Sequence, residues 1–173
     1  MNKTLETVAE MMAVAARTAP KAAGADFIEI KVITGADVKL LGNEMIKYGK
    51  EQGKYNYDRD GDNVRRSGAV LLLALSDSEP IFQDCGACGF ATCNEMKEHF
   101  SEGDEFAGPL CAWRIIDLGI ALGSAVKTAS LFNVDNRIMY RLGVVARKLG
   151  LIKGEHVIGV PLSITGKSIY YDR

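Results

Sequence analysis

The spacing of apolar residues predicts two helices and a strand in the first 50 positions. Within residues 4–17 apolar side chains recur every three or four positions, as on one face of a helix, and Pro20 ends that helix. Residues 27–33 alternate apolar and charged side chains, which is typical of a strand with one buried face. Thr34 then begins a second helix, with Asp37 three residues later as a partial capping box.

The rest of the chain predicts further strands and helices around a buried strand. Residues 68–76 are apolar without alternation, which favours a strand covered on both faces. Residues 113–131 and 135–149 are predicted helices, and residues 156–161 a final strand. Residues 49–63, rich in glycine, tyrosine and charge, are interpreted as an exposed connection. Helices that interleave with strands predict an α/β (α+β) layered fold, and we expect one domain over residues 1–173.

Charge and hydropathy exclude several classes of function. The formal net charge is −1 and the sequence pI about 6.1, so no electrostatic footprint for nucleic acid is expected. The first residues carry acids where a signal peptide needs an apolar core, and residues 115–131 are interrupted by Asp117 and Lys127. We therefore expect a cytoplasmic protein without a membrane or nucleic-acid partner.

All four cysteines lie close together in the sequence, which points to metal binding rather than to disulfides. Cys85, Cys88, Cys93 and Cys111 have the spacing Cys-x2-Cys-x4-Cys-x17-Cys. Three thiolates on one tight loop can reach three corners of a 4Fe–4S cubane, and a distant fourth completes the ligand set. Glycines directly after the first two cysteines would let the backbone wrap closely around such a cluster.

Two predicted helix starts support an anionic group at this place. One helix is expected to begin near Cys93 and another just after Cys111, and helix N-termini stabilise negative charge by about 0.3–1 kcal/mol each. A structural zinc site also uses four cysteines, but usually as two Cys-x2-Cys pairs. Zinc and unligated thiols remain the alternatives to an iron–sulfur cluster.

The cysteine segment resembles a known iron–sulfur domain. Residues 85–93 read C-G-A-C-G-F-A-T-C, and residues 108–111 read G-P-L-C. This run is similar to the small 4Fe–4S domain of several anaerobic redox proteins, and the resemblance implies that all four cysteines are cluster ligands. We take residues 82–112 as the cluster-binding segment.

The whole chain resembles the uncharacterised ferredoxin-domain-containing proteins of anaerobic bacteria and archaea. The resemblance rests on three stretches, at residues 16–21, 117–125 and 161–167. A second similarity, to FMN-dependent nitroreductases, rests on an early A-R-x-A-P stretch, a central helix entered through D-L-G and a late v-i-G-v-P strand. It implies a nitroreductase-like layered fold into which the cysteine segment is inserted.

The nitroreductase resemblance also implies a homodimer with flavin at the subunit interface. On this basis Arg17 and Lys21 are candidates to bind the FMN phosphate, and Gly159 and Pro161 to lie near the flavin ring. The alternative interpretation is that Arg17 is a helix C-terminal cation and that Gly159–Pro161 ends a strand. One difference from nitroreductases is the segment at residues 22–27, which replaces their N-x-Q-P/S-W run.

Three functional hypotheses follow from the sequence. The first is a 4Fe–4S electron-transfer protein or redox-enzyme component, which exchanges electrons with a partner protein or a small-molecule oxidant. The second is a flavin oxidoreductase fed by the cluster. The third is a non-enzymatic module that zinc stabilises. No residue is assigned a catalytic role.

Overall fold

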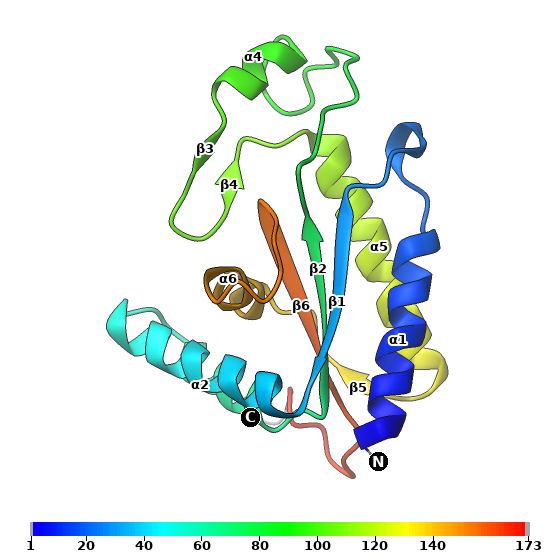
Figure 1. The fold of residues 1–173 in the computed structure, drawn as a ribbon, viewed down its shortest axis with the longest axis vertical. Coiled ribbons are helices and arrows are strands. Elements are labelled where there is room, and N and C mark those ends of the chain that lie inside the picture. The colour runs from blue at the N-terminus through cyan, green and yellow to red at the C-terminus, as the bar shows by residue number, and fades with distance from the viewer. Residues whose placement is uncertain (1, 172–173) are drawn as a thin grey trace.

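The computed structural model describes residues 2–171, which form an antiparallel sheet with helices on both faces (Figure 1). The order of strands in the sheet is β1-β2-β6-β5. The strands are β1 (Ile28–Thr34), β2 (Ala69–Leu75), β5 (Asp135–Asn136) and β6 (His156–Ser163), with a separate hairpin of β3 (Ser101–Glu102) and β4 (Ala107–Gly108). The helices are α1 (Asn2–Thr18), α2 (Gly35–Glu51), α3 (Tyr57–Arg65), α4 (Cys93–Glu98), α5 (Ala112–Leu131) and α6 (Tyr140–Lys148), with a short 3-10 helix η1 (Ala22–Gly24).

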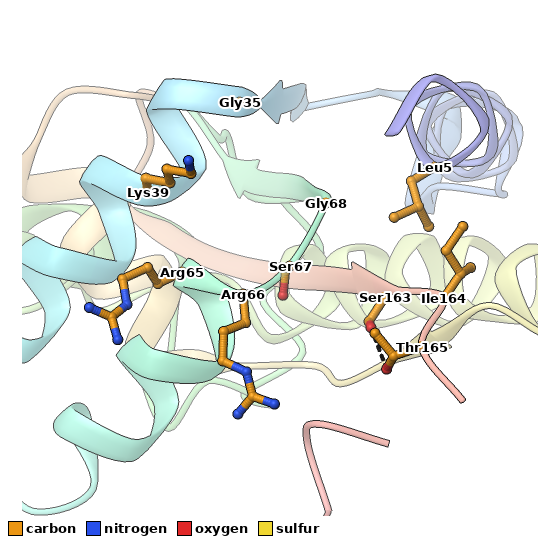
Figure 2. Close-up of a pocket in the computed structure, with 10 residues that line it drawn as sticks. All are labelled: Leu5, Gly35, Lys39, Arg65, Arg66, Ser67, Gly68, Ser163, Ile164 and Thr165. Carbon is orange, nitrogen blue, oxygen red and sulfur yellow. Dashed lines mark hydrogen bonds between the residues drawn. The ribbon is translucent and has the colours of Figure 1, made fainter. Parts of the chain in front are cut away.

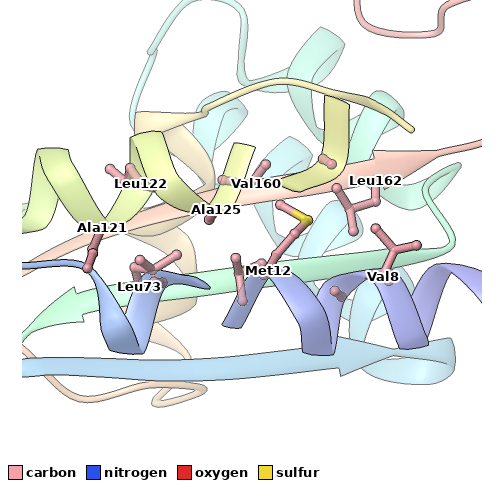
Figure 3. Packing of buried hydrophobic residues seen from close by; sticks show 14 of the residues in the cluster. Val8, Met12, Leu73, Ala121, Leu122, Ala125, Val160 and Leu162 are labelled. Carbon is pink, nitrogen blue, oxygen red and sulfur yellow. The ribbon is translucent and has the colours of Figure 1, made fainter. Parts of the chain in front are cut away.

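Strand β2 lies inside the sheet and separates two apolar layers. Leu71 and Leu73 face one layer, with α1 and α5, and Figure 3 shows Leu73 between Met12 of α1 and Ala121 of α5. Leu72 faces the other layer, formed mainly by α2, α3 and α6. Every residue of β2 is buried, because alternate side chains of a strand point to opposite faces. The prediction of a strand covered on both faces is therefore confirmed.

Most of the predicted elements are present. The helices expected at residues 4–17 and 113–131 correspond to α1 and α5, and the strand expected at residues 27–33 corresponds to β1. The second helix, α2, begins directly after Thr34, as expected. The side chain of Thr34 nevertheless makes no capping hydrogen bond.

The prediction that residues 49–63 form an exposed connection is wrong. The end of α2 and most of α3 occupy this range, and the Tyr57 and Asp60 side chains are almost fully buried. Asp60 is not buried as an isolated charge, because it forms ion pairs with Arg59 (2.8 Å) and Arg141 (2.9 Å). The polar sequence of α3 therefore packs as a helix, because α6 supplies the positive charge of Arg141 to Asp60.

The predicted helix over residues 135–149 is also shorter than expected. Asp135 and Asn136 pair with Ser163 and Leu162 as strand β5, and α6 begins only at Tyr140. The final strand accordingly continues to Ser163 rather than ending at residue 161. The pairing with β6 supplies backbone hydrogen bonds that a helix in this position would otherwise make itself.

The cysteine-bearing segment lies at one end of the sheet. Helix α4 and the β3–β4 hairpin lie beyond the carboxyl end of β2, opposite the end where α1 begins (Figure 1). The chain leaves β2, forms α4 and the hairpin, and returns into α5. Among residues 2–171, no helix is long and apolar enough to cross a membrane.

Candidate iron–sulfur site

All four cysteines line one narrow pocket, although they come from three different parts of the backbone. Cys85 and Cys88 lie on the loop between β2 and α4, Cys93 is the first residue of α4, and Cys111 is the N-cap residue of α5. Cys93 and Cys111 are buried, Cys88 is partly buried and Cys85 is exposed. The tertiary structure therefore gathers the thiols that the sequence spacing groups together.

Two glycines shape the loop between the first three cysteines. Gly86 has φ +72° and Gly89 has φ +90°, a region of backbone conformation that disfavours side chains with a Cβ. The Gly89 N–H donates to the Gly86 carbonyl (2.9 Å) and closes a turn. A Cβ at Gly89 would meet no protein atom within 4 Å, so the left-handed backbone, rather than crowding by the protein, requires glycine here.

Side chains next to the cysteines fix the start of α4. Thr92 Oγ1 accepts the Glu95 N–H (3.1 Å) as an N-cap, and the Glu95 carboxylate accepts the Ala91 N–H (3.0 Å). The Cys93 N–H donates to Asp84 Oδ1 (2.7 Å). The helix start expected near Cys93 is confirmed, but the amide of Cys93 is already used by Asp84.

The exposed Cys85 thiol has an environment that favours the thiolate. The pKa of Cys85 lies below its usual value, because the backbone N–H of Ala87 and the indole of Trp113 donate hydrogen bonds to the sulfur. Thiolate is the form of cysteine that binds metals. The loop therefore favours the thiolate form of this side chain.

A buried ion pair anchors the first turn of α5, directly after Cys111. Arg114 Nη1 lies 3.1 Å from Asp117 Oδ2, and both side chains are at most 5 % exposed. Arg114 also donates to the carbonyls of Glu79 (2.7 Å) and Ala22 (2.8 Å). Because Glu79 lies on the chain that leads from β2 into the cysteine loop, this arginine connects the two ends of the segment to each other and to η1.

A second polar network fastens the β3–β4 hairpin to the helices of the α2 layer. Glu105 accepts hydrogen bonds from Lys54, from the Tyr57 hydroxyl (3.2 Å) and from the Tyr140 hydroxyl. Burial alone would raise the pKa of Glu105, but the bonds from Lys54 and the two tyrosines outweigh it and lower that pKa. Sequence analysis missed Glu105, since its partners lie 35 to 51 residues away.

The donor set fits an iron–sulfur cluster. Four cysteines converge on one pocket, and Asp84, the one acidic side chain lining it, already accepts the Cys93 amide. Within residues 2–171, no group of three or more histidine, cysteine or acidic side chains is placed to hold a metal ion. Iron–sulfur clusters are ligated by cysteine thiolates, so the four-cysteine donor set is compatible with their chemistry.

The cationic candidates for flavin binding already have protein partners. Arg17 Nη1 donates to Asp26 Oδ2 (2.7 Å) and to the Ile28 carbonyl (2.7 Å). Lys21, whose side chain is only 5 % exposed, donates to the carbonyls of Ala16 (2.8 Å) and Arg17 (2.6 Å). Both residues therefore tie the C-terminal end of α1 to the start of β1.

The other two flavin candidates lie in the interior of strand β6. Gly159 pairs with Leu72, and a Cβ built on it would come within 1.9 Å of Leu142 Cδ2. Pro161 pairs with Val70 and is buried. A Cβ at position 159 would therefore displace the Leu142 side chain, by which α6 packs on the sheet. The cationic pair and the strand pair belong to separate elements, and no described pocket contains members of both.

A separate cationic pocket of about 300 Å³ lies at the other end of the sheet. Figure 2 shows Lys39, Arg65 and Arg66 on one side of it, and Ser163 and Thr165 on the other. The three cations come from α2, from the end of α3 and from the residue after α3, so no local sequence pattern predicted that they would line one pocket.

The fold is similar to that of solved FMN oxidoreductases. A nitroreductase with bound FMN from Desulfitobacterium hafniense has a TM-score of 0.61 and 12 % identity, over 94 % of this chain and 79 % of that one. The NADPH:FMN oxidoreductase from Vibrio harveyi has a TM-score of 0.56 and 14 % identity, over 94 % of this chain. The chain spans 61 % of the length of that enzyme. The predicted nitroreductase-like α/β fold is thereby confirmed.

The sequence itself has a full-length relative and a family match. An uncharacterized protein of Archaeoglobus fulgidus is 45 % identical over 172 residues, which are 99 % of this chain and 93 % of the relative. The model of a family described as "Uncharacterized protein containing a ferredoxin domain" (DUF2148) matches residues 107–173, which include Cys111 but not the other three cysteines. The chain therefore belongs to this family of proteins that contain a ferredoxin domain.

Proposed function

We propose that this protein is an iron–sulfur redox protein with one 4Fe–4S cluster ligated by Cys85, Cys88, Cys93 and Cys111. The observation that carries the proposal is the convergence of these four thiols, from three separate segments, on one pocket. Membership of a family described as containing a ferredoxin domain supports it. When bound, such a cluster accepts and donates single electrons without making or breaking bonds in the protein.

The chain's own residues would hold this site rigid and accessible on one side. Arg114 and Glu105 fix the two flanks of the segment, so the buried Cys93 and Cys111 are anchored to the body of the fold. Cys85 is exposed, so that side of the pocket faces solvent. An electron could then enter or leave at the exposed loop, because electron transfer to a partner needs one accessible edge of the site.

The test is chemical analysis of the full chain purified without oxygen. We expect about four irons and four acid-labile sulfides per chain, with a broad visible absorption band that dithionite bleaches. Cys111→Ser should lose the iron and the band, whereas Met96→Leu, at a non-ligand position lining the same pocket, should retain both. Stoichiometric zinc after anaerobic handling and attempted reconstitution would instead establish the zinc-stabilised module.

A second candidate function is a flavin oxidoreductase that receives electrons from the cluster. The cationic pocket of Figure 2 supports it, since Lys39, Arg65 and Arg66 line it. Asp62 pairs with both arginines (2.6 and 3.4 Å), so one carboxylate balances three cations and net positive charge remains for a phosphate group. The relatives in fold include one nitroreductase described with bound FMN and one described as FMN-dependent. Arg17 and Lys21 are the competing phosphate-binding residues, and substituting each set separately distinguishes them. If FMN binds in the cationic pocket, Arg66→Ala should weaken FMN binding about tenfold, and Arg17→Ala should leave FMN binding unchanged.

The flavin hypothesis also proposes a homodimer. The outer face of α5 carries Ile116, Ile120 and Leu131, which are 46 %, 39 % and 72 % exposed. A face of this kind is a candidate interface for a second copy of the chain. Ile120→Asp should convert a dimer to a monomer in analytical ultracentrifugation, and a wild-type protein that sediments as a monomer would contradict the proposal.

A further inference from the structure

A second pocket of about 290 Å³ lies against the cysteine pocket and shares two of its residues, Met96 and Cys111. Its walls come from the chain that leaves β2, from α4, from the residues before α5 and from Glu155, just before β6. We call it the acidic pocket. Because Cys111 lines both pockets, any molecule bound in the acidic pocket is a neighbour of a proposed cluster ligand.

The charged groups of the acidic pocket carry an excess of negative charge. Asp77, Glu79 and Glu155 line it, and Lys97 is the one cation among its lining residues. Lys97 is engaged by Glu79, with its Nζ 2.6 Å from Glu79 Oε2. Asp77 and Glu155 therefore remain without a cationic partner among the lining residues, and their charge favours a positively charged ligand.

The two carboxylate oxygens of Glu155 differ in their hydrogen bonding. Its backbone is fixed by hydrogen bonds to Leu75 (2.8 Å) and from Ala107 (2.9 Å), and its Oε1 accepts the Asp77 N–H (2.7 Å). Its Oε2 is buried and has no hydrogen-bond partner among the residues that the structure describes. A buried carboxylate oxygen without a donor is unfavourable, so a positive charge in the adjoining pocket would stabilise it.

Apart from Ser78, the uncharged walls of the pocket are mainly apolar. Phe100, although large and hydrophobic, is 44 % exposed, and Pro109 and Leu110 are only partly buried. Ligand pockets typically combine such apolar walls with a few polar groups that fix orientation. An aromatic ring such as Phe100 also attracts cations to its face. The combination therefore selects an organic cation rather than a bare metal ion or an anion.

We propose that the acidic pocket binds a small organic cation, with its charged group at Glu155 and Asp77 and its apolar body against Phe100 and Leu110. The proposal deepens the proposed function and rests on it for its redox meaning, because it names the class of small molecule that exchanges electrons with the cluster. If the bound cation is redox-active, a cluster held by Cys111 and the other three cysteines would exchange single electrons with it, and no bond would form or break.

The first test measures binding directly. Full-length protein, purified without oxygen, is titrated in a calorimeter with methyl viologen, an aromatic dication, and with anthraquinone-2-sulfonate, an anion. We expect saturable binding of methyl viologen only, weakened about tenfold by Glu155→Gln. The matched control is Glu102→Gln, which removes a 69 % exposed carboxylate outside the acidic pocket and should change the affinity less than twofold.

A second variant protects the test against misfolding. Asp77 has φ +49°, a conformation that asparagine also tolerates, so Asp77→Asn should fold normally and still weaken methyl viologen binding. Equal affinity of wild type and both variants, or equally tight binding of the anion, would overturn the proposal. Iron and sulfide analysis of the same samples separates the two hypotheses. Cation binding without iron refutes the proposed function alone, and iron without cation binding refutes this inference alone.

Discussion

Removal of the Glu105 carboxylate should loosen the hairpin that leads to Cys111. The Glu105 side chain is 18 % exposed and is the shared acceptor for Lys54, Tyr57 and Tyr140. The tyrosine hydroxyls and the ammonium group belong to the body of the fold, whereas the carboxylate belongs to the hairpin. The change Glu105→Ala therefore removes every hydrogen bond by which this carboxylate links the hairpin to the body of the fold.

The size of the destabilisation follows from the hydrogen bond that each partner of Glu105 loses. Tyr57 is 2 % exposed, so its hydroxyl would be left buried without its acceptor, which costs about 1–3 kcal/mol. Tyr140 is 44 % exposed and Lys54 about one-third exposed, so water replaces much of what they lose, and each contributes about 0–1 kcal/mol. We expect Glu105→Ala to lower the free energy of unfolding by about 3 kcal/mol, and Glu105→Gln by about half as much.

Urea denaturation followed by circular dichroism measures these differences. The matched control is Glu102→Ala, which removes the neighbouring hairpin carboxylate that pairs with Arg147 but is 69 % exposed, and should cost less than about 1 kcal/mol. A double-mutant cycle of Glu105→Gln with Tyr57→Phe should show a coupling energy of about 1 kcal/mol.

Two results would refute the reasoning about this network. A Glu105→Ala variant as stable as Glu102→Ala would mean that the network does not hold the hairpin. Additive effects of Glu105→Gln and Tyr57→Phe would mean that the two side chains do not interact in solution.

Three further predictions concern pH, packing and the buried ion pair. Burial lowers the pKa of His156, whose ring packs on Phe106 (ring centroids 4.2 Å apart). As the pH falls, His156 is therefore protonated at a higher pH in the unfolded chain than in the folded chain. Stability should therefore fall as the pH decreases below 6.5, and His156→Phe should flatten that slope in urea titrations at a series of pH values. Gly159→Ala should lower the free energy of unfolding by about 1–3 kcal/mol with or without flavin, and a neutral effect would show that the Leu142 side chain moves aside. Arg114→Met should cost about 3–5 kcal/mol by leaving Asp117 buried and unpaired, and adding Asp117→Asn should restore part of this loss in thermal melts.

The sequence was most informative where the relevant interactions are local. The apolar run of β2 indicated a doubly covered strand, because every side chain of a buried strand needs an apolar neighbour on its own face. The helix start predicted near Cys93 is confirmed, and the structure shows why it is local: Thr92 and Glu95 cap α4 within one helical turn. The four cysteines that the spacing grouped together line one pocket, including the distant Cys111.

Tertiary structure decided the features whose partners lie far apart in the chain. Helix α3 was missed because its polar residues are compensated from α6: Asp60 is paired with Arg141, 81 positions later. The role of Glu105, the unpartnered oxygen of Glu155 and the cations of the Figure 2 pocket follow from the same cause. Sequence patterning records which residues are apolar and how often they recur, so it predicts elements and their buried faces. It does not record which charge meets which, because that depends on how distant elements pack.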